Sequence, residues 1–294
     1  MASATQYTGL VKNPEVQAII ALALAEDTVG NDLTSRLVIP PDLEATAELT
    51  AKAEGVLAGL DIFAEVFGKI DARLRVERFF SDGSRIKPGD IIARLSGNVH
   101  SLLSAERVAL NFLCHLSGVA TGTARYVEKL AGSAAVVTDT RKTMPGMRLL
   151  EKYAVYCGGG TNHRLDLADG ILIKDNHLAA LAGRRSLREV VAQARHDAPA
   201  GTVVEVEVSS LGQAEEAVAG GADIVLLDNM GTGLMAEVVK RLAGRAIFEA
   251  SGGIDLSKVA AVAGSGVNRI SVGAITHSSR VLDFSLEMKP KGKS

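Results

Sequence analysis

Residues 202–208 (TVVEVEV) and 223–228 (DIVLLD) are two short runs of mainly β-branched and aliphatic residues, separated by about one helix of chain. Similar runs flank this pair: AVVTDT (135–140), GILIK (170–174), AIFEA (246–250) and NRISVG (268–273). Helical patterns lie between the runs, near residues 147–158, 186–197, 211–220, 233–243 and 256–264. Regular alternation of strand and helix is typical of βαβ units with right-handed crossovers and predicts a parallel sheet. Because only these strands are evident, we expect any barrel to be incomplete or to recruit further strands.

The chain before residue 115 has a different pattern. NPEVQAIIALALAED (13–27) predicts a helix in which Asn13 is the N-cap and Pro14 lies in the first turn. ATAELTAKAEG (45–55) alternates small apolar and polar residues, which is typical of a half-exposed strand. Further helix and strand patterns follow it. We therefore predict an α+β domain at residues 1–115 and an α/β domain at residues 116–294, whose last residues can pack back on the first domain.

The segment of residues 101–132 (SLLSAERVALNFLCHLSGVATGTARYVEKLAG) joins the two predicted domains. The spacing of its apolar residues predicts a helix over most of its length. Ser117 and Gly118 lie in the middle of this segment, and glycine destabilises the interior of a helix. We therefore expect the helix to break there.

Composition and charge exclude several function classes. With 294 residues, 47% of them hydrophobic, the chain can bury the cores of about two domains. The formal net charge of −2 gives no overall positive field, so we expect no nucleic-acid partner and no membrane surface; any anion site must be built locally. The chain shows neither a signal-peptide pattern nor an uninterrupted apolar run of about 18 residues. Cys114 and Cys157 lack the spacing of a disulfide framework or zinc site, so we expect a cytoplasmic protein.

Polar, charged or glycine residues end every strand predicted in the second domain. In a parallel α/β barrel, the loops that follow the strands form one rim, and this rim carries the chemistry. The residues at these positions are Thr140, Arg141 and Lys142; Lys174; Glu207; Asp228; Ser251, Gly252 and Gly253; and Gly273, with His277 shortly after it. Solvation of strand ends is the ordinary explanation for any one of them.

The acids of VEVEV do not fit that ordinary explanation. Glu205 and Glu207 lie on one face of the strand with valines on the other. Parallel strands are covered on both faces, and a buried acid is costly unless it is paired or bound to a metal. Because Glu207 is nearer the end of the strand, we expect it, rather than Glu205, at the rim.

These residue types indicate the ligands. Arg141, His163 and Arg164 offer positive charge for carboxylates, and Lys142 and Lys174 add point charges. Glycine-rich turns that precede helices suit phosphate. Paired carboxylates near phosphate suit Mg²⁺. We therefore predict a polycarboxylate ligand and a phosphorylated ligand held together with Mg²⁺.

Residues 138–177 (TDTRKTMPGMRLLEKYAVYCGGGTNHRLDLADGILIKDNH) closely resemble the signature region of the quinolinate phosphoribosyltransferase family. The resemblance includes ERVALN (106–111), VEVEV (204–208), ADIVLLDN (222–229), EASGGI (249–254) and ISVGAITHS (270–278). It implies an open parallel α/β barrel with an N-terminal α+β sandwich domain, and a homodimer. It also implies a Mg²⁺-dependent enzyme that converts quinolinate and 5-phosphoribosyl 1-diphosphate to nicotinate mononucleotide, CO₂ and diphosphate in NAD synthesis.

The resemblance implies a role for each candidate residue. Arg141, His163 and Arg164 are expected to bind the quinolinate carboxylates, and Arg107 is expected to enter the partner subunit's site. The expected catalytic residues are Lys142 and Lys174, which border both substrates, and Glu207 and Asp228, which serve the ribose and hold Mg²⁺ directly or through water. The expected phosphate site consists of Ser251, Gly252, Gly253 and Gly273, with His277 near this phosphate or the diphosphate; Thr140 is a further substrate contact.

Three alternatives remain. A related molybdenum-locus homologue shares the fold, but the intact TRK (140–142) and LIKDNH (172–177) favour quinolinate. A nicotinate phosphoribosyltransferase needs only one carboxylate clamp. A non-catalytic anion-binding barrel predicts binding without turnover and poorly explains Glu207 and Asp228 among the cations.

Overall fold

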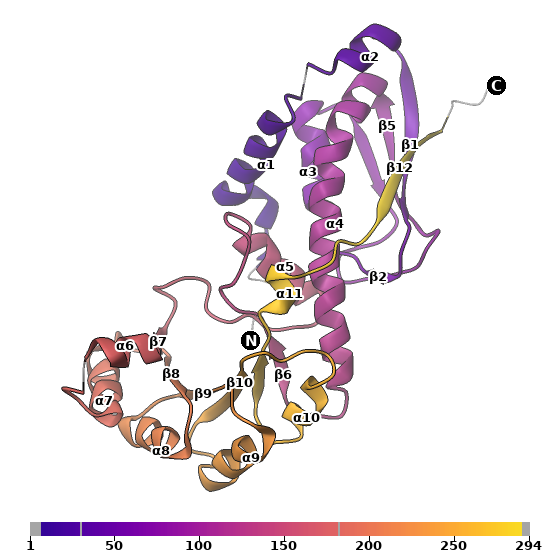
Figure 1. Cartoon of the computed structure of the whole chain (residues 1–294). Coiled ribbons are helices and arrows are strands. Elements are labelled where there is room, and N and C mark those ends of the chain that lie inside the picture. The colour runs from indigo at the N-terminus through magenta and orange to yellow at the C-terminus, as the bar shows by residue number, and fades with distance from the viewer. Residues whose placement is uncertain (1–6, 30, 182, 290–294) are drawn as a thin grey trace. The chain divides into compact units, whose positions relative to one another are not determined.

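The structure is a computed structural model that describes residues 7–29, 31–181 and 183–289 (Figure 1). Its packing divides the chain into two compact units. The first unit comprises residues 1–124, 143–159 and 276–294, and the second comprises residues 125–142 and 160–275. The two units therefore alternate along the chain.

The first unit contains a four-stranded antiparallel sheet. Its strand order is β12 (Phe284–Lys289), β1 (Glu44–Ala51), β5 (Ile91–Asn98) and β3 (Arg75–Arg78). Strand β12 pairs with β1 from Ala51↔Phe284 to Thr46↔Lys289, so the end of the described chain completes the sheet near its beginning. A smaller antiparallel pair joins β2 (Gly55–Val56) and β4 (Arg85–Ile86).

Helices complete the first unit. They are η2 (Leu10–Lys12), α1 (Pro14–Glu26), α2 (Leu33–Val38), α3 (Leu60–Ile70) and α5 (Arg148–Cys157); α4 (Val99–Lys129) and α11 (Ala274–His277) cross the boundary between the units along the chain. Asn13 caps α1 by accepting a hydrogen bond from Glu15 N (2.8 Å), and Pro14 occupies the first turn, as predicted. Phe63 and Phe67 of α3 are fully buried in the core.

The second unit is built on a six-stranded parallel sheet. Its strand order is β6 (Val136–Thr138), β11 (Arg269–Ser271), β10 (Ile247–Ser251), β9 (Ile224–Asp228), β8 (Val204–Val208) and β7 (Ile171–Ile173). The helices that follow its strands are α6 (Asp175–Ala180), α7 (Leu187–Asp197), α8 (Leu211–Gly220), α9 (Thr232–Arg241) and α10 (Val259–Ala263) (Figure 1). Strands β6 and β7 end the sheet on opposite sides, so the barrel is open between them. The predicted fold class, an open parallel α/β barrel with an N-terminal α+β sandwich, is confirmed.

Parallel pairing brings the carboxyl ends of the strands to one edge of this sheet. Ser251 of β10 lies beside Asp228 of β9, and Glu207 of β8 lies beside Leu226 of β9. Ser186 and Ser210 cap α7 and α8 through their hydroxyl groups, which ends each preceding loop at a defined residue. Side chains that follow the strands are consequently close in space although they are far apart in sequence.

Two further sequence expectations can be compared with the structure. Cys114 and Cys157 are both free thiols, as expected. Among the helices of the described ranges, none has both the length and the apolar character needed to cross a lipid bilayer.

The predicted helix break at Gly118 is wrong, because α4 continues without interruption from Val99 to Lys129. The reason for the glycine is a close approach of another part of the first unit. A Cβ atom built on Gly118 would lie 2.2 Å from the carbonyl oxygen of Arg280 and 3.0 Å from Val281 Cα. Gly118 therefore makes room for the chain that leads to β12 and does not end the helix.

The substitution Gly118→Ala is expected to destabilise the protein by about 2 kcal/mol, because the added methyl group overlaps main-chain atoms. Gly122→Ala in the same helix is the matched control, since its Cβ would meet only Ser279 Oγ at 3.9 Å. There the helix preference of alanine should stabilise the protein by up to about 1 kcal/mol. Urea unfolding of both variants measures the difference. Equal stability of the two variants would contradict the explanation.

Candidate active site

A cavity of about 610 Å³ lies where the strands of the parallel sheet end. Its lining brings together most of the residues that the sequence singled out: Thr140, Arg141, Lys142, His163, Arg164, Lys174, Glu207, Asp228, Ser251, Gly252 and Gly253. Leu172, Leu226, Asn229 and Ser271 complete the lining. All of these residues belong to the second unit.

Three predicted residues are not part of this lining. Gly273 follows β11 in the second unit, whereas Arg107 of α4 and His277 of α11 belong to the first unit. The roles expected for these three residues stay predictions.

Two arginines of the cavity have N–H groups that no described residue accepts. The Nε atoms of Arg141 and Arg164 are buried and lack a hydrogen-bond partner in the part of the chain that the structure describes. Burial, followed by the charge of Arg141, lowers the pKa of Arg164, so the two guanidinium groups lie close enough to repel each other. A ligand with two carboxylates would offset this repulsion and would supply acceptors for the guanidinium N–H groups.

Two carboxylates also line the cavity. Burial raises the pKa of Glu207, the negative charge of Asp228 raises it further, and Lys174 opposes both effects. Two acids that repel each other beside a cation form a donor set that fits Mg²⁺, a cation that binds through one or two carboxylates together with phosphate oxygens and water. Glu207 and Asp228 can therefore hold this ion.

The loop after β10 requires glycine. Gly252 has φ 98°, and a Cβ atom there would lie 2.3 Å from Asn229 Oδ1 and 2.8 Å from Asn229 N. Asn229 in turn donates its main-chain N–H to Ser251 O (2.9 Å) and its side-chain amide to Asp228 Oδ2 (2.7 Å). The main chain of Gly252, after β10, therefore packs directly against Asn229, after β9. Because glycine lacks a side chain, a ligand can closely approach the main chain at Gly252 and Gly253, which line the cavity.

The loop that carries His163 and Arg164 is held by a buried acid at its start. Thr161 lies beside β6, donating its N–H to Val137 O (2.8 Å). Asp139, which is completely buried, then accepts hydrogen bonds from His163 N (2.7 Å) and from the side-chain amide of Asn162 (2.9 Å). The main chain that leads to Arg164 is therefore fixed to the end of β6.

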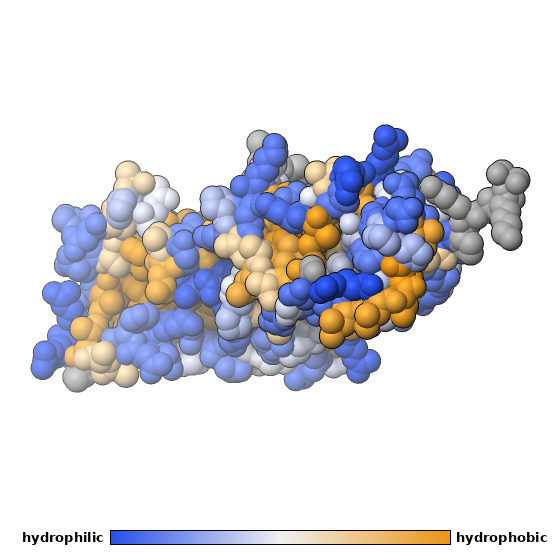
Figure 2. Space-filling model, turned by 90° about the horizontal axis from the view of Figure 1, so that it is seen from above, coloured by the Kyte–Doolittle hydropathy of each residue, from blue (hydrophilic) through white to orange (hydrophobic). Residues whose placement is uncertain are grey.

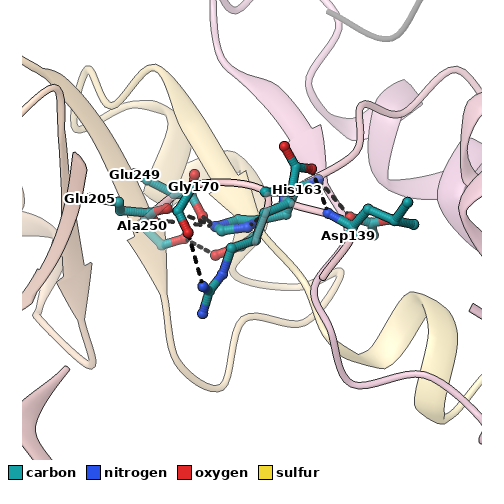
Figure 3. Close-up of polar contacts among 10 residues, drawn as sticks. Asp139, His163, Gly170, Glu205, Glu249 and Ala250 are labelled. Carbon is teal, nitrogen blue, oxygen red and sulfur yellow. Dashed lines mark hydrogen bonds and ion pairs between the residues drawn. The ribbon is translucent and has the colours of Figure 1, made fainter. Parts of the chain in front are cut away.

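The imidazole ring of His163 is directed at two further buried acids, as Figure 3 shows. Its Nε2 atom lies 3.0 Å from Glu205 Oε2 and 3.5 Å from Glu249 Oε1. Its Nδ1 atom accepts a hydrogen bond from Arg164 N (2.9 Å). The two acids of VEVEV thus differ in location: Glu205 is buried against His163, whereas Glu207 lines the cavity.

Sequence reasoning missed Asp139 and Glu249 as residues that support the site. A usable signal existed for Glu249, because it is an acid inside the apolar run AIFEA, as Glu205 is inside VEVEV. Asp139 is the last residue but one of AVVTDT (135–140) and has the pattern of any polar residue at a strand end. Its contacts with residues more than 20 positions later are formed only in the folded chain.

Comparisons with known proteins agree with this geometry. The family model described as quinolinate phosphoribosyl transferase, C-terminal domain, matches residues 119–287, and the corresponding N-terminal domain model matches residues 32–117. The chain is 42% identical over 269 residues to the probable nicotinate-nucleotide pyrophosphorylase (carboxylating) of Bacillus subtilis, covering 92% of each protein. It is 40% identical over 279 residues to the nicotinate-nucleotide pyrophosphorylase (carboxylating) of Mycobacterium leprae, covering 92% of this chain and 95% of that protein.

A solved structure, described as NadC from Streptococcus pyogenes, has a TM-score of 0.89 and 44% sequence identity to this chain. The match covers 94% of this chain and 96% of the solved one, so it includes both units. With both domain models matched in order and relatives aligned over nearly their full length, the chain belongs to the quinolinate phosphoribosyltransferase family.

Proposed function

We propose that this chain is a type II phosphoribosyltransferase that converts quinolinate and 5-phosphoribosyl 1-diphosphate to nicotinate mononucleotide, CO₂ and diphosphate in de novo NAD synthesis. The observation that carries the proposal is the composition of one cavity. Arg141 and Arg164 offer a clamp for two carboxylates in the same space where Glu207 and Asp228 offer ligands for a metal ion. The arginines can bind the two carboxylates of quinolinate, and Glu207 and Asp228 can hold the metal ion that accompanies the phosphoribosyl donor.

The arginines hold quinolinate. Its two adjacent carboxylates match two guanidinium groups that repel each other. The Nε–H groups of both arginines have no hydrogen-bond partner among the described residues. Lys142 and Lys174 add positive charge between the two substrates. Leu172 and Leu226 add apolar surface to the lining of the cavity.

The loops after β9, β10 and β11 hold the phosphoribosyl donor. The N–H groups of Ser251, Gly252 and Gly253, with Gly273, bind the 5-phosphate. Glu207 and Asp228 serve the ribose and would hold Mg²⁺ directly or through water, where the ion would neutralise charge on the leaving diphosphate.

The order of bond changes follows from the charges. As the bond from C1 of the ribose to diphosphate breaks, positive charge develops on the sugar, and the Glu207 carboxylate stabilises it. The pyridine nitrogen of quinolinate then bonds to C1 and becomes cationic. The bond from the neighbouring ring carbon to its carboxylate can now break: CO₂ leaves, the electron pair stays on the ring carbon, where the adjacent cationic nitrogen stabilises it, and a proton from water then takes the place of CO₂. Decarboxylation therefore follows ribosylation.

The proposed enzyme is a homodimer in which Arg107 enters the partner subunit's site. An exposed apolar surface on α1 and α2 supports association: Leu22, Leu33, Leu37 and Val38 are between 66% and 82% exposed. Figure 2 looks down on the molecule from the side of α2 and shows apolar residues interrupting the hydrophilic surface. Exposed aliphatic side chains are common in interfaces between subunits.

Incubation of the protein with quinolinate, 5-phosphoribosyl 1-diphosphate and Mg²⁺ is expected to yield nicotinate mononucleotide and CO₂ in equal amounts. Chelation of the metal with EDTA should stop the reaction, and added Mg²⁺ should restore it. Nicotinate should not replace quinolinate. Turnover of nicotinate alone would favour a nicotinate phosphoribosyltransferase, and quinolinate binding without turnover would favour a non-catalytic barrel.

The substitution Arg141→Ala is expected to raise the KM for quinolinate roughly 10- to 100-fold, since a hydrogen bond to a charged group contributes about 1.5–3 kcal/mol. The KM for the phosphoribosyl donor should change little. Arg141→Lys is the matched control: it keeps the charge and loses the fork, so its effect should be intermediate. An unchanged quinolinate KM in Arg141→Ala would remove Arg141 from the clamp.

Subunit mixing tests the role of Arg107. The variants Arg107→Ala and Arg141→Ala should each have low activity under subsaturating quinolinate. Coexpression should restore roughly a quarter of the wild-type activity, because half of the random dimers contain one intact site out of two. Arg107→Ala coexpressed with itself is the control. Activity no higher than the mean of the two variants would place Arg107 outside the partner's site.

A further inference from the structure

The geometry points to Glu205 and Glu249 as positioning residues: acting through His163, they fix the main chain of Arg164 and so aim its guanidinium group into the cavity. That this group binds a quinolinate carboxylate rests on the proposed function. The fixing of the loop does not, because it can be read from the described contacts alone.

Both ring nitrogens of His163 are engaged by the protein. Nδ1 accepts the N–H of Arg164 (2.9 Å), so the ring proton of a neutral His163 is on Nε2. Nε2 is 3.0 Å from Glu205 Oε2 and 3.5 Å from Glu249 Oε1. The side chain is only 9% exposed. Turning the ring or moving its proton would break the contacts on both edges, so the two acids determine the tautomer and the ring orientation.

The ring contact and the Asp139 contact fix Arg164 from two directions. Asp139 holds the main-chain N–H of His163, and the His163 ring holds the main-chain N–H of Arg164. The Arg164 side chain lines the cavity, where Nη1 donates to Gly170 O (3.3 Å) and the buried Nε has no hydrogen-bond partner among the described residues. If the His163 ring could turn, the main-chain N–H of Arg164 would lose its acceptor, and the position of the guanidinium group would be less well fixed.

The two acids cannot both be charged at low cost. Glu249 is fully buried, and within the described ranges neither of its carboxyl oxygens has a hydrogen-bond partner. The ligand atoms of His163, Glu205 and Glu249 all lie within 4.8 Å of one another. Burial, followed by the charge of Glu205, raises the pKa of Glu249. Burial therefore favours the neutral form of Glu249, and a neutral carboxyl group fills the space beside the ring without adding a second charge.

The test compares three variants. Glu249→Gln is neutral and has the same shape, so it should keep the quinolinate KM within about twofold of the wild type. Glu249→Ala leaves the ring unsupported and should raise that KM on the order of 10- to 100-fold, with little change in the KM for the phosphoribosyl donor. Glu237→Ala, on the exposed side of α9 in the same unit, is the control and should have no effect.

Equilibrium binding of quinolinate, measured by calorimetry, should follow the same order as the KM. Two results would overturn the proposal: Glu249→Gln losing as much affinity as Glu249→Ala, or a folded Glu249→Ala with unchanged affinity. One equivalent of a bound transition metal in the purified protein, detected by elemental analysis and lost in Glu249→Gln, would also overturn it, because the cluster would then be a metal site.

A spectroscopic readout keeps the test independent of turnover and of variant folding. Long-range ¹H–¹⁵N NMR of the wild type, with His163 assigned by comparison with His163→Gln, should show an unprotonated Nδ1 and a protonated Nε2 at neutral pH. A protonated Nδ1 would overturn the proposal even if every variant failed to fold. A wild type that shows this tautomer but has no phosphoribosyltransferase activity would instead refute the proposed function alone.

Discussion

Burial of positively charged side chains beside one another in a single cavity is the constraint on which the rest of the second unit depends. Arg141 and Arg164 are close enough for the charge of one to lower the pKa of the other, and neither Nε–H is satisfied by a described residue. Such an arrangement persists only if the surrounding chain holds it rigidly. A dianionic ligand offsets the repulsion, so the same constraint that makes the arrangement costly also selects for anions.

Buried acids provide the rigidity. Asp139 holds the loop at His163 N, and Glu205 with Glu249 holds the ring that accepts the next N–H along the chain. Glu207 and Asp228 have a different place, on the cavity wall, where their charges are available to a ligand. One set of carboxylates in this unit therefore lies behind the cations, and another set lines the cavity.

The register of the parallel sheet separates these two sets. Glu205 is opposite Leu172 of β7, and Glu207 is opposite Leu226 of β9, two residues nearer the strand end. A slip of one residue would turn both acids to the other face and place valines at the cavity. Register is itself maintained by the apolar residues of β8 and β9, which are buried almost throughout. Packing of the sheet thus fixes the chemistry at its edge.

Local signals explain why much of the site was predictable. Lys174 and Asp228 each directly follow an apolar run, Arg141 follows the strand pattern AVVTDT, and parallel strands necessarily bring such positions to one edge. The helix continues through Gly118, although glycine weakens helices, because the chain at Arg280, more than 160 residues away, packs too closely for a side chain at this position. His163 was found from its polar neighbours, but its two buried partners come from β8 and β10.

The sequence by itself determined the alternation of strands and helices, the family, and the residue types at the strand ends, since each depends on neighbours within a few positions. Only the tertiary structure decided that Glu205 supports while Glu207 lines the cavity, that Glu249 lies against His163, and that Asp139 anchors the loop. These assignments depend on distances between segments up to about a hundred residues apart. Such distances arise from sheet register and close packing, which no local pattern encodes.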